Sequence, residues 1–164
     1  MAGKADFTPD EWTALKKSPL MASLVVVAAS PSGPIGVVKE MFAVGKLVAE
    51  TKAKGGSNAL VDGIVAELTT REGMEGTKPT EIQGMSPDQA RTHALDALRS
   101  AATLASKKAP ADADGYKRWL LEVSTRVASA SKEGGFLGFG GTLVSEKEEA
   151  ALRDTASALG IQKT

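Results

Sequence analysis

Three short segments of this chain each carry the residues that begin an α-helix. In Thr8-Pro9-Asp10-Glu11 and Ser86-Pro87-Asp88-Gln89, a hydroxyl residue precedes a proline, and an acidic or amide residue stands three positions after the hydroxyl. Ser145-Glu146-Lys147-Glu148 repeats the pattern without the proline. In such capping boxes, two side chains bind backbone N–H groups that the first helical turn leaves unpaired. Because the three signals are widely separated, they predict helices along the whole chain.

The spacing of apolar residues predicts about seven helices. The second is apolar nearly all round, which is typical of a helix at the centre of a bundle. In the third, Val38, Met41, Phe42 and Leu47 form the expected core face. Aromatic residues make up only 4% of the chain, so alanine, leucine and valine must supply most of the buried area. The expected ranges are residues 9–17, 19–29, 35–52, 58–70, 87–106, 113–131 and 146–159.

Glycine and proline separate these helices. Ser30-Pro31-Ser32-Gly33-Pro34 and Gly55-Gly56 each end one of them, and Gly160 is a natural C-terminal stop. Residues 71–85 contain glycines and a proline without a clear period, which predicts a long loop. The chain has 164 residues, so we expect one all-α domain over 1–164, a single-domain helical bundle. Similar Ala/Ser-rich helix ends precede two of the turns, so two pseudo-repeated helical hairpins are a further possibility.

The composition argues against several classes of function. The 20 basic and 20 acidic residues give a formal net charge of zero, and both signs are spread over both halves. Because a nucleic-acid binder needs a concentrated basic face, we expect no nucleic acid partner. Without cysteine the chain has no disulfide, thiolate nucleophile or cysteine metal site. The N-terminus lacks an apolar signal core, and Leu20–Ala29 is too short to cross a bilayer, so we expect a cytoplasmic protein without a transmembrane segment.

No set of residues predicts an enzyme. His93 is the single histidine, and Asp96 beside it makes only a surface pair at helical spacing. The segment Asp112-Ala113-Asp114-Gly115 lacks the ligand spacing of a calcium loop, so helix N-capping is the better explanation of its acids. Trp12 and Trp119 stand at helical positions that are typical of core anchors. We therefore expect no catalytic residue, no cofactor and no metal site.

A glycine-rich segment, GGFLGFGG at residues 134–141, precedes the last helix. It nearly matches a P-loop, but Gly141 stands where the phosphate-binding lysine belongs, and no strand precedes it. Either it is a joint between two helices with its phenylalanines in the core, or the phenylalanines are an exposed anchor for a partner or membrane surface. The candidate contact residues are Phe136, Gly138, Phe139 and Gly140.

Two pieces of the chain resemble the TerB-like family of tellurite-resistance proteins. One piece is LVSEKEEAAL at residues 143–152, followed by Ala158-Leu159-Gly160. The other is VVVAAS at residues 25–30, followed by Gly33-Pro34-Ile35-Gly36 and Lys39-Glu40. The resemblance implies an all-α domain of paired helical hairpins and a non-enzymatic role in metal-linked or membrane-associated stress responses.

The chain departs from that family at its turns. The family's turns usually carry an acidic Ala-Asp-Gly-type sequence that is thought to hold a cation. The corresponding turns here, at residues 30–33 and 138–142, contain no aspartate. The resemblance therefore extends to the fold and does not predict a cation at these turns.

We expect a non-catalytic helical scaffold or interaction protein that acts through a partner protein, with a role in stress response. The alternative is a binding protein for an apolar small molecule, a lipid surface or a metal ion. Its cleft would lie near Phe136, Phe139 and the segment Leu24–Val27. Self-association and peripheral contact with a membrane both remain open.

Overall fold

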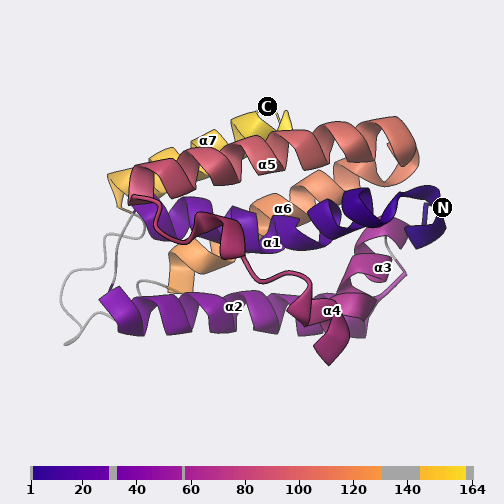
Figure 1. Cartoon of the computed structure of the whole chain (residues 1–164), viewed down its shortest axis with the longest axis horizontal. Helices are drawn as coiled ribbons and strands as arrows, with labels where there is room; N and C mark the ends of the chain where they lie inside the picture. The colour runs from indigo at the N-terminus through magenta and orange to yellow at the C-terminus, as the bar shows by residue number, and fades with distance from the viewer. Residues whose placement is uncertain (1, 30–32, 57, 131–144, 162–164) are drawn as a thin grey trace.

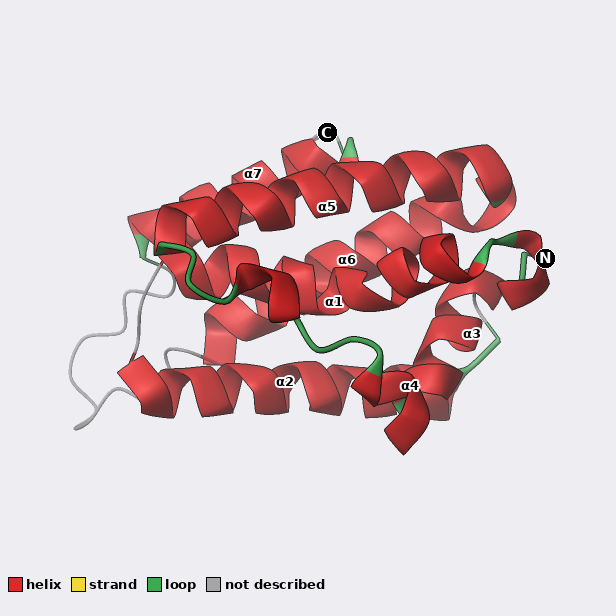
Figure 2. Cartoon of the chain, viewed as in Figure 1, coloured by secondary structure: helices red, strands yellow, loops and turns green. Residues whose placement is uncertain are grey.

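The computed structural model describes residues 2–29, 33–56, 58–130 and 145–161, with the side chains of residues 33–40 left out. Within these residues the chain forms seven α-helices, two short 3-10 helices and no strand (Figures 1 and 2). The predicted all-α helical bundle is therefore confirmed. The α-helices are α1 (Pro9–Ala29), α2 (Gly33–Lys54), α3 (Ala59–Leu68), α4 (Arg71–Glu75), α5 (Pro87–Lys108), α6 (Pro110–Ala130) and α7 (Glu146–Leu159).

Two helices, α1 and α6, lie at the centre of the bundle. Each contacts the other and also α2, α3, α5 and α7. In Figure 1, α5 and α7 lie on one side of this pair and α2 on the other. Met21, Ala22, Val25 and Val26 of α1 are at most 2% exposed, which confirms the predicted central position of that apolar segment.

The first two predicted helices are one continuous helix. We expected a break before Pro19, but α1 runs through this proline. A proline inside a helix has no N–H for the carbonyl four residues earlier, here that of Leu15. The hydroxyl of Tyr116 on α6 donates to this carbonyl at 3.4 Å. The chain can therefore keep the helix intact because a neighbouring helix supplies a donor at the point where the proline removes one.

A second hydroxyl of α6 reaches the backbone of α1 further along. Ser124 Oγ donates to the carbonyl of Ala22 at 2.9 Å, and both groups are buried. Tyr116 and Ser124 are completely buried, so neither hydroxyl exchanges its protein partner for water. Burial also raises the pKa of Tyr116 well above its ordinary value, which keeps the phenol protonated and able to donate. The two hydroxyl contacts fix the position of α6 along α1.

The three predicted capping boxes are confirmed. Reciprocal bonds join Ser86 to Gln89 and Ser145 to Glu148 at the starts of α5 and α7. Thr8 exchanges the same pair of bonds with Glu11, at 2.8 and 3.3 Å, at the start of α1. At the end of α7, the predicted stop occurs at Gly160, whose φ of 69° is left-handed.

The predicted loop at residues 71–85 is partly wrong, since it contains the short helix α4 and the 3-10 helix Thr80–Ile82. Thr70 caps α4 by accepting a hydrogen bond from the N–H of Gly73. A Cβ added to Gly73 would lie 2.1 Å from the carbonyl oxygen of Glu67. Glycine is therefore required for the chain to turn directly from α3 into α4, and the sequence analysis missed this role.

The start of α6 also differs from the prediction. The helix begins at Pro110, so Asp112 lies within its first turn and does not cap it from outside. Its carboxylate accepts hydrogen bonds from the backbone N–H groups of Ala59 and Ala2, each at 3.1 Å. Asn58 Nδ2 donates to the Asp112 carbonyl at 2.7 Å. Asp112 therefore joins the start of α6 to the start of α3 and to the N-terminal segment.

One charged cluster joins α3 to α1. Glu67 accepts from Lys4 at 2.8 Å and from Lys16 at 2.9 Å. Partial burial raises the pKa of Glu67, but the two ammonium groups outweigh it and lower that pKa to about 2. The indole N–H of Trp12 points towards the same carboxylate, but it has no partner in normal hydrogen-bond geometry among the described residues. Glu67 therefore stabilises the fold through its charge.

Substitution of Tyr116 by phenylalanine is expected to lower the unfolding free energy by about 1–2 kcal/mol, because the Leu15 carbonyl then has no donor. The same change should cost less in a Pro19→Ala background, where residue 19 supplies an N–H. Urea denaturation of the four proteins in this cycle measures the coupling. Ser124→Ala is the matched control. Ser124 binds the carbonyl of Ala22, which lies beyond the proline, so this substitution should lower the unfolding free energy equally with Pro19 and with Ala at position 19. Equal costs for Tyr116→Phe would contradict the compensation.

The Glu67 cluster predicts a defined dependence of stability on pH. A carboxylate with a lowered pKa stabilises the folded state above its unfolded pKa, and this contribution disappears as the pH falls through the folded pKa. Glu67→Gln should therefore cost about 1–2 kcal/mol at pH 7, less at pH 4 and almost nothing near pH 2. Denaturation at several pH values tests this, with Glu75→Gln on exposed α4 as the control that should show little effect. A constant cost between pH 7 and 2 would disprove the electrostatic explanation.

Candidate functional site

The helix α2 exposes two large apolar side chains. Met41 is 61% exposed and Phe42 is 74% exposed. Both were predicted to lie on a core face with Val38 and Leu47, and this is wrong for both. Leu47 is buried, at 3%, and the side chain of Val38 lies outside the described part of the structure. Among the described residues, α2 is covered on one side only, and its buried stripe is formed by Val44, Leu47 and Val48. With about 3.6 residues per turn, Phe42 points away from that stripe, whereas Met41 lies at its edge, near the start of the helix.

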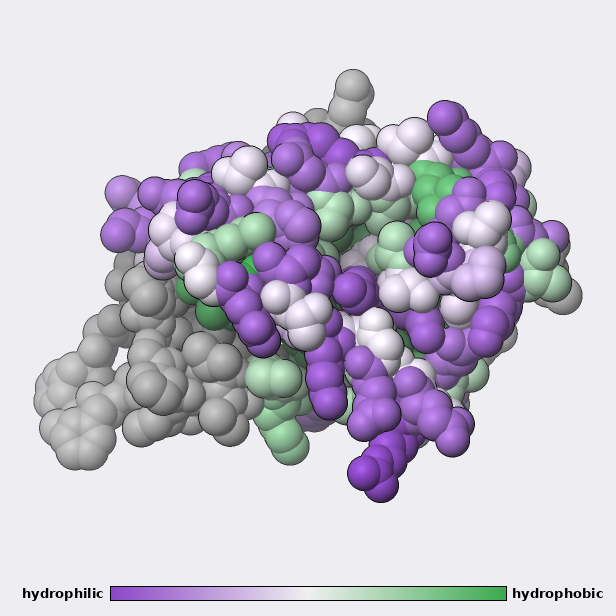
Figure 3. Space-filling model, in the orientation of Figure 1, coloured by the Kyte–Doolittle hydropathy of each residue, from purple (hydrophilic) through white to green (hydrophobic). Residues whose placement is uncertain are grey.

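The opposite side of α2 is named here the outer face. Its residues are all exposed, and most of them are apolar or small. On the view of the surface in Figure 3, hydrophilic side chains predominate and hydrophobic ones form small separate areas. Met74 and Met85 are also exposed, at 58% and 37%, but Phe42 is the one exposed aromatic side chain among the described residues, and with Met41 it forms the one pair of exposed large apolar neighbours there. The outer face consists of Met41, Phe42, Gly45, Lys46, Ala49, Lys52 and Ala53.

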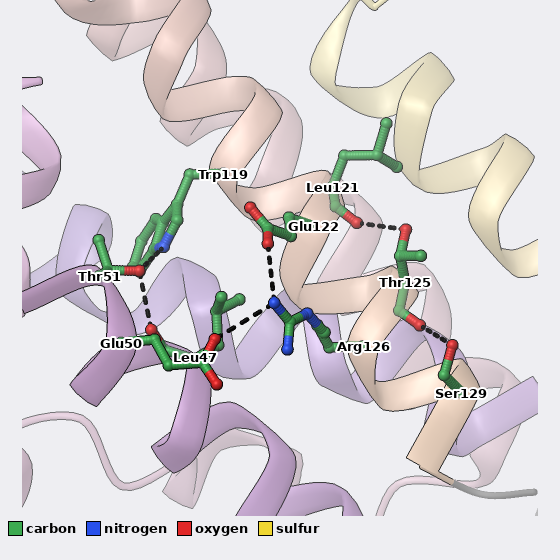
Figure 4. Close-up of polar contacts among 9 residues, drawn as sticks. All are labelled: Leu47, Glu50, Thr51, Trp119, Leu121, Glu122, Thr125, Arg126 and Ser129. Atoms are coloured by element: carbon green, nitrogen blue, oxygen red, sulfur yellow. Dashed lines mark hydrogen bonds and ion pairs between the residues drawn. The ribbon is translucent and has the colours of Figure 1, made fainter. Parts of the chain in front are cut away.

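The inner face of α2 is fixed to α6 by a partly buried hydrogen bond. Trp119 of α6 is 6% exposed, and its indole N–H donates to Thr51 Oγ1 at 3.1 Å (Figure 4). The Thr51 hydroxyl in turn donates to the carbonyl of Leu47 at 2.8 Å. This confirms Trp119 as a core anchor, and Trp12, at 3% exposure, is a second one. The hydroxyl of Thr51 thus accepts one hydrogen bond and donates another, so it is not a free nucleophile.

An ion-pair network continues the same contact towards the C-terminal end of α6. Arg126 reaches Glu50 of α2 at 3.2 Å and Glu122 of its own helix at 3.4 Å (Figure 4). All three side chains are partly exposed, and pairs of this kind contribute about 0–1 kcal/mol each. Their effect is therefore mainly on orientation: together with Trp119, they determine which side of α2 points outwards.

A shallow hollow of about 320 Å³ lies between α2, α3 and α6, beside this contact. Leu47 and Trp119 line it with apolar surface, and Lys54 and Arg118 line it with exposed cations. The acids there, Glu50 and Glu122, are the ones already paired with Arg126. The hollow offers no nucleophile beside a base, and its chemistry is that of a contact surface.

A glycine, Gly45, stands in the middle of the outer face, and no contact within the described chain requires a glycine there. Gly45 lies within α2, and a Cβ built on it would meet no atom within 4 Å. A glycine inside a helix costs about 1 kcal/mol relative to alanine. Neither a close contact nor a positive φ within the chain explains this cost. The space above Gly45 is open to an external molecule.

The predicted contact residues Phe136, Gly138, Phe139 and Gly140 lie outside the described residues, as does the joint that they were predicted to form. Of the segment predicted to line a cleft with them, Val25 and Val26 are fully buried, and Leu24 and Val27 are partly buried against the core. That segment serves the core of the bundle.

His93 does not form a catalytic set in the structure. It lines an open hollow on α5 with Asp88 and Asp96. The carboxylate of Asp96 is bound by Arg99 at 2.5 Å, so it does not orient the imidazole. No group of three or more histidine and acidic side chains positioned to hold a metal ion occurs within the described residues. In the same part of the chain, no helix has the length and apolar character needed to span a bilayer.

Comparison with models of known protein families, with curated proteins and with solved structures finds no match for this chain. The resemblance to TerB-like proteins therefore stays a prediction. The outer face of α2 could not be found from apolar periodicity, because a buried and an exposed apolar residue have the same pattern. The signal available in the sequence was Gly45, a glycine in the middle of a strongly predicted helix.

Substitution of Gly45 by alanine is expected to raise the unfolding free energy by about 0.5–1 kcal/mol, because alanine has the higher helix propensity and no contact is lost. Gly63 in α3 is the matched control, since a Cβ there would lie 3.2 Å from the ring of Trp12. Gly63→Ala should therefore bring no gain, or a loss. Urea denaturation of both variants tests the difference. A neutral or destabilising Gly45→Ala would show that the chain itself requires this glycine.

Proposed function

We propose that this chain is a non-catalytic helical interaction protein that presents the outer face of α2 to a partner protein. The observation that carries the proposal is the exposure of Phe42 and Met41, at 74% and 61%, on a helix whose other side is tightly fixed. Aromatic and methionine side chains are enriched in the centres of protein interfaces. Leaving both in water is unfavourable for the isolated chain, and a partner that covers them removes that cost.

The arrangement of α2 supports a role in binding rather than in catalysis. The hydrogen bond of Trp119 to Thr51 and the ion pairs of Arg126 hold the helix in one orientation. A rigid surface of this kind loses little conformational freedom on binding, which favours affinity. The resemblance to TerB-like proteins adds an expected role in stress response.

A lipid surface is the second candidate, because Lys46 and Lys52 flank the apolar residues of the outer face. Helices that lie on membranes combine an apolar face with flanking basic residues. The centre of the face, however, consists of Gly45, Ala49 and Ala53, which offer little apolar area for insertion. The same small residues suit the close approach of another protein, so we rank the protein partner first.

Phe42→Ser combined with Met41→Ser is expected to abolish capture of the partner while leaving the fold intact, since both side chains lie in water. The test compares proteins recovered from the native cell by wild type and variant under identical conditions. Met85→Ser is the matched control, because Met85 is also exposed, at 37%, and precedes α5 on the other side of the bundle (Figure 1).

Specific partners should be recovered by wild type and by the Met85 control, and lost with the double variant. If every specific partner binds the double variant as well as wild type, the outer face is not the docking surface. Circular dichroism of the three proteins ensures that a loss reflects the surface and not unfolding.

A further inference from the structure

We infer that the partner of the outer face is an acidic amphipathic helix that packs lengthwise along α2. This inference rests on the proposed function and deepens it, since it specifies the chemistry of the partner.

The charge around the outer face is positive. Lys46 and Lys52 are exposed, one on each flank of the face. Lys52 donates to the neutral hydroxyl of Thr69 at 2.8 Å. Among the described residues, neither lysine is paired with a carboxylate, although the chain as a whole has as many acids as bases. Glu50, the single acid of this part of α2, is paired with Arg126.

Charges at the edges of an apolar contact favour partners that carry the opposite charge at their own edges. Lysines on both flanks attract carboxylates at the edges of the partner and repel a partner with basic edges. Because Arg126 already neutralises Glu50, that acid does little to counter the lysines. A partner with aspartate or glutamate on either side of an apolar stripe therefore matches both the centre and the edges of the outer face.

The shape of the outer face fits a helix. Gly45, Ala49 and Ala53 follow one another at intervals of four residues, which places them in one row along α2. Rows of small residues form grooves into which the side chains of a second helix pack, at interaxial distances of 8–10 Å. Phe42 and Met41 stand at one end of this row and supply the large apolar contacts. A second helix can follow such a row over its whole length.

A second copy of the chain fits this surface less well. In a two-fold symmetric dimer, the same patch meets itself, so the lysines of one outer face would approach those of the other. An anionic membrane would satisfy the lysines, but it gains little from the row of small residues. The acidic helix alone satisfies both the charge and the small residues.

The test is a selection of helical peptides from a displayed library in which apolar stripes are held constant and the flanking charges vary. Against wild-type protein, the selected peptides should carry an excess of Asp and Glu at the flanks. Against Lys46→Glu/Lys52→Glu, the preference should change to basic flanks. An acidic peptide should bind this variant about fivefold to tenfold more weakly than wild type. The corresponding Lys107→Glu/Lys108→Glu change on α5 is the control and should alter neither result.

The outcomes separate this inference from the proposed function. If selection enriches no helical peptide, or enriches peptides without acidic flanks, the acidic helix is excluded, whereas loss of cellular partners on Phe42→Ser/Met41→Ser would still support the docking surface. Sedimentation of the protein alone tests for a dimer lost on Phe42→Ser, and flotation with vesicles of phosphatidylserine and phosphatidylcholine tests for a membrane. Either result, without an acidic-peptide preference, would assign the surface to that other occupant.

Discussion

The rest of the bundle depends on the contact between α1 and α6, where side-chain hydroxyls meet backbone carbonyls in a dry interior. Pro19 removes a helical hydrogen bond in the middle of α1, and an unpaired buried carbonyl costs about 1–3 kcal/mol. Tyr116 supplies the replacement from α6 at 3.4 Å. Ser124 makes a second such bond at 2.9 Å. Unlike apolar contacts, these bonds are directional, so they hold α6 in one position along α1.

That position decides what α2 can do. Trp119 and Arg126 belong to the same helix as Tyr116 and Ser124, but they face α2 and bind Thr51 and Glu50. The orientation of α2 therefore follows from the orientation of α6, which in turn is fixed by α1. A weakened α1–α6 contact should loosen α2 before it unfolds the bundle, because α2 lies at the edge and is covered on one side only.

The sequence predicted the features that depend on local chemistry. The capping residues at Ser86 and Ser145 and the stop at Gly160 act within a few residues of chain, so their effects could be inferred directly. The continuity of α1 could not be inferred, because the donor that stabilises it is Tyr116, which is remote in sequence from Pro19. The exposure of Phe42 also depends on which helices cover α2, and periodicity does not contain that information. Gly73 and Gly45 illustrate the same limit, since only the space around each shows whether the chain itself requires a glycine.

The outer face of α2 combines two features that are unfavourable for the isolated chain. Gly45 costs helix stability, and Phe42 and Met41 remain in water. Natural chains tolerate local costs of this kind mainly where function requires them. Lys46 and Lys52 add no cost, because water solvates them, but among the described residues they have no acidic partner and can pair with an external carboxylate. One acidic helix packed on this face would approach closely at the glycine, cover Phe42 and Met41 with its apolar stripe and pair its carboxylates with the lysines. That a single partner offsets both costs and matches the charge is the strongest argument that the surface binds a partner.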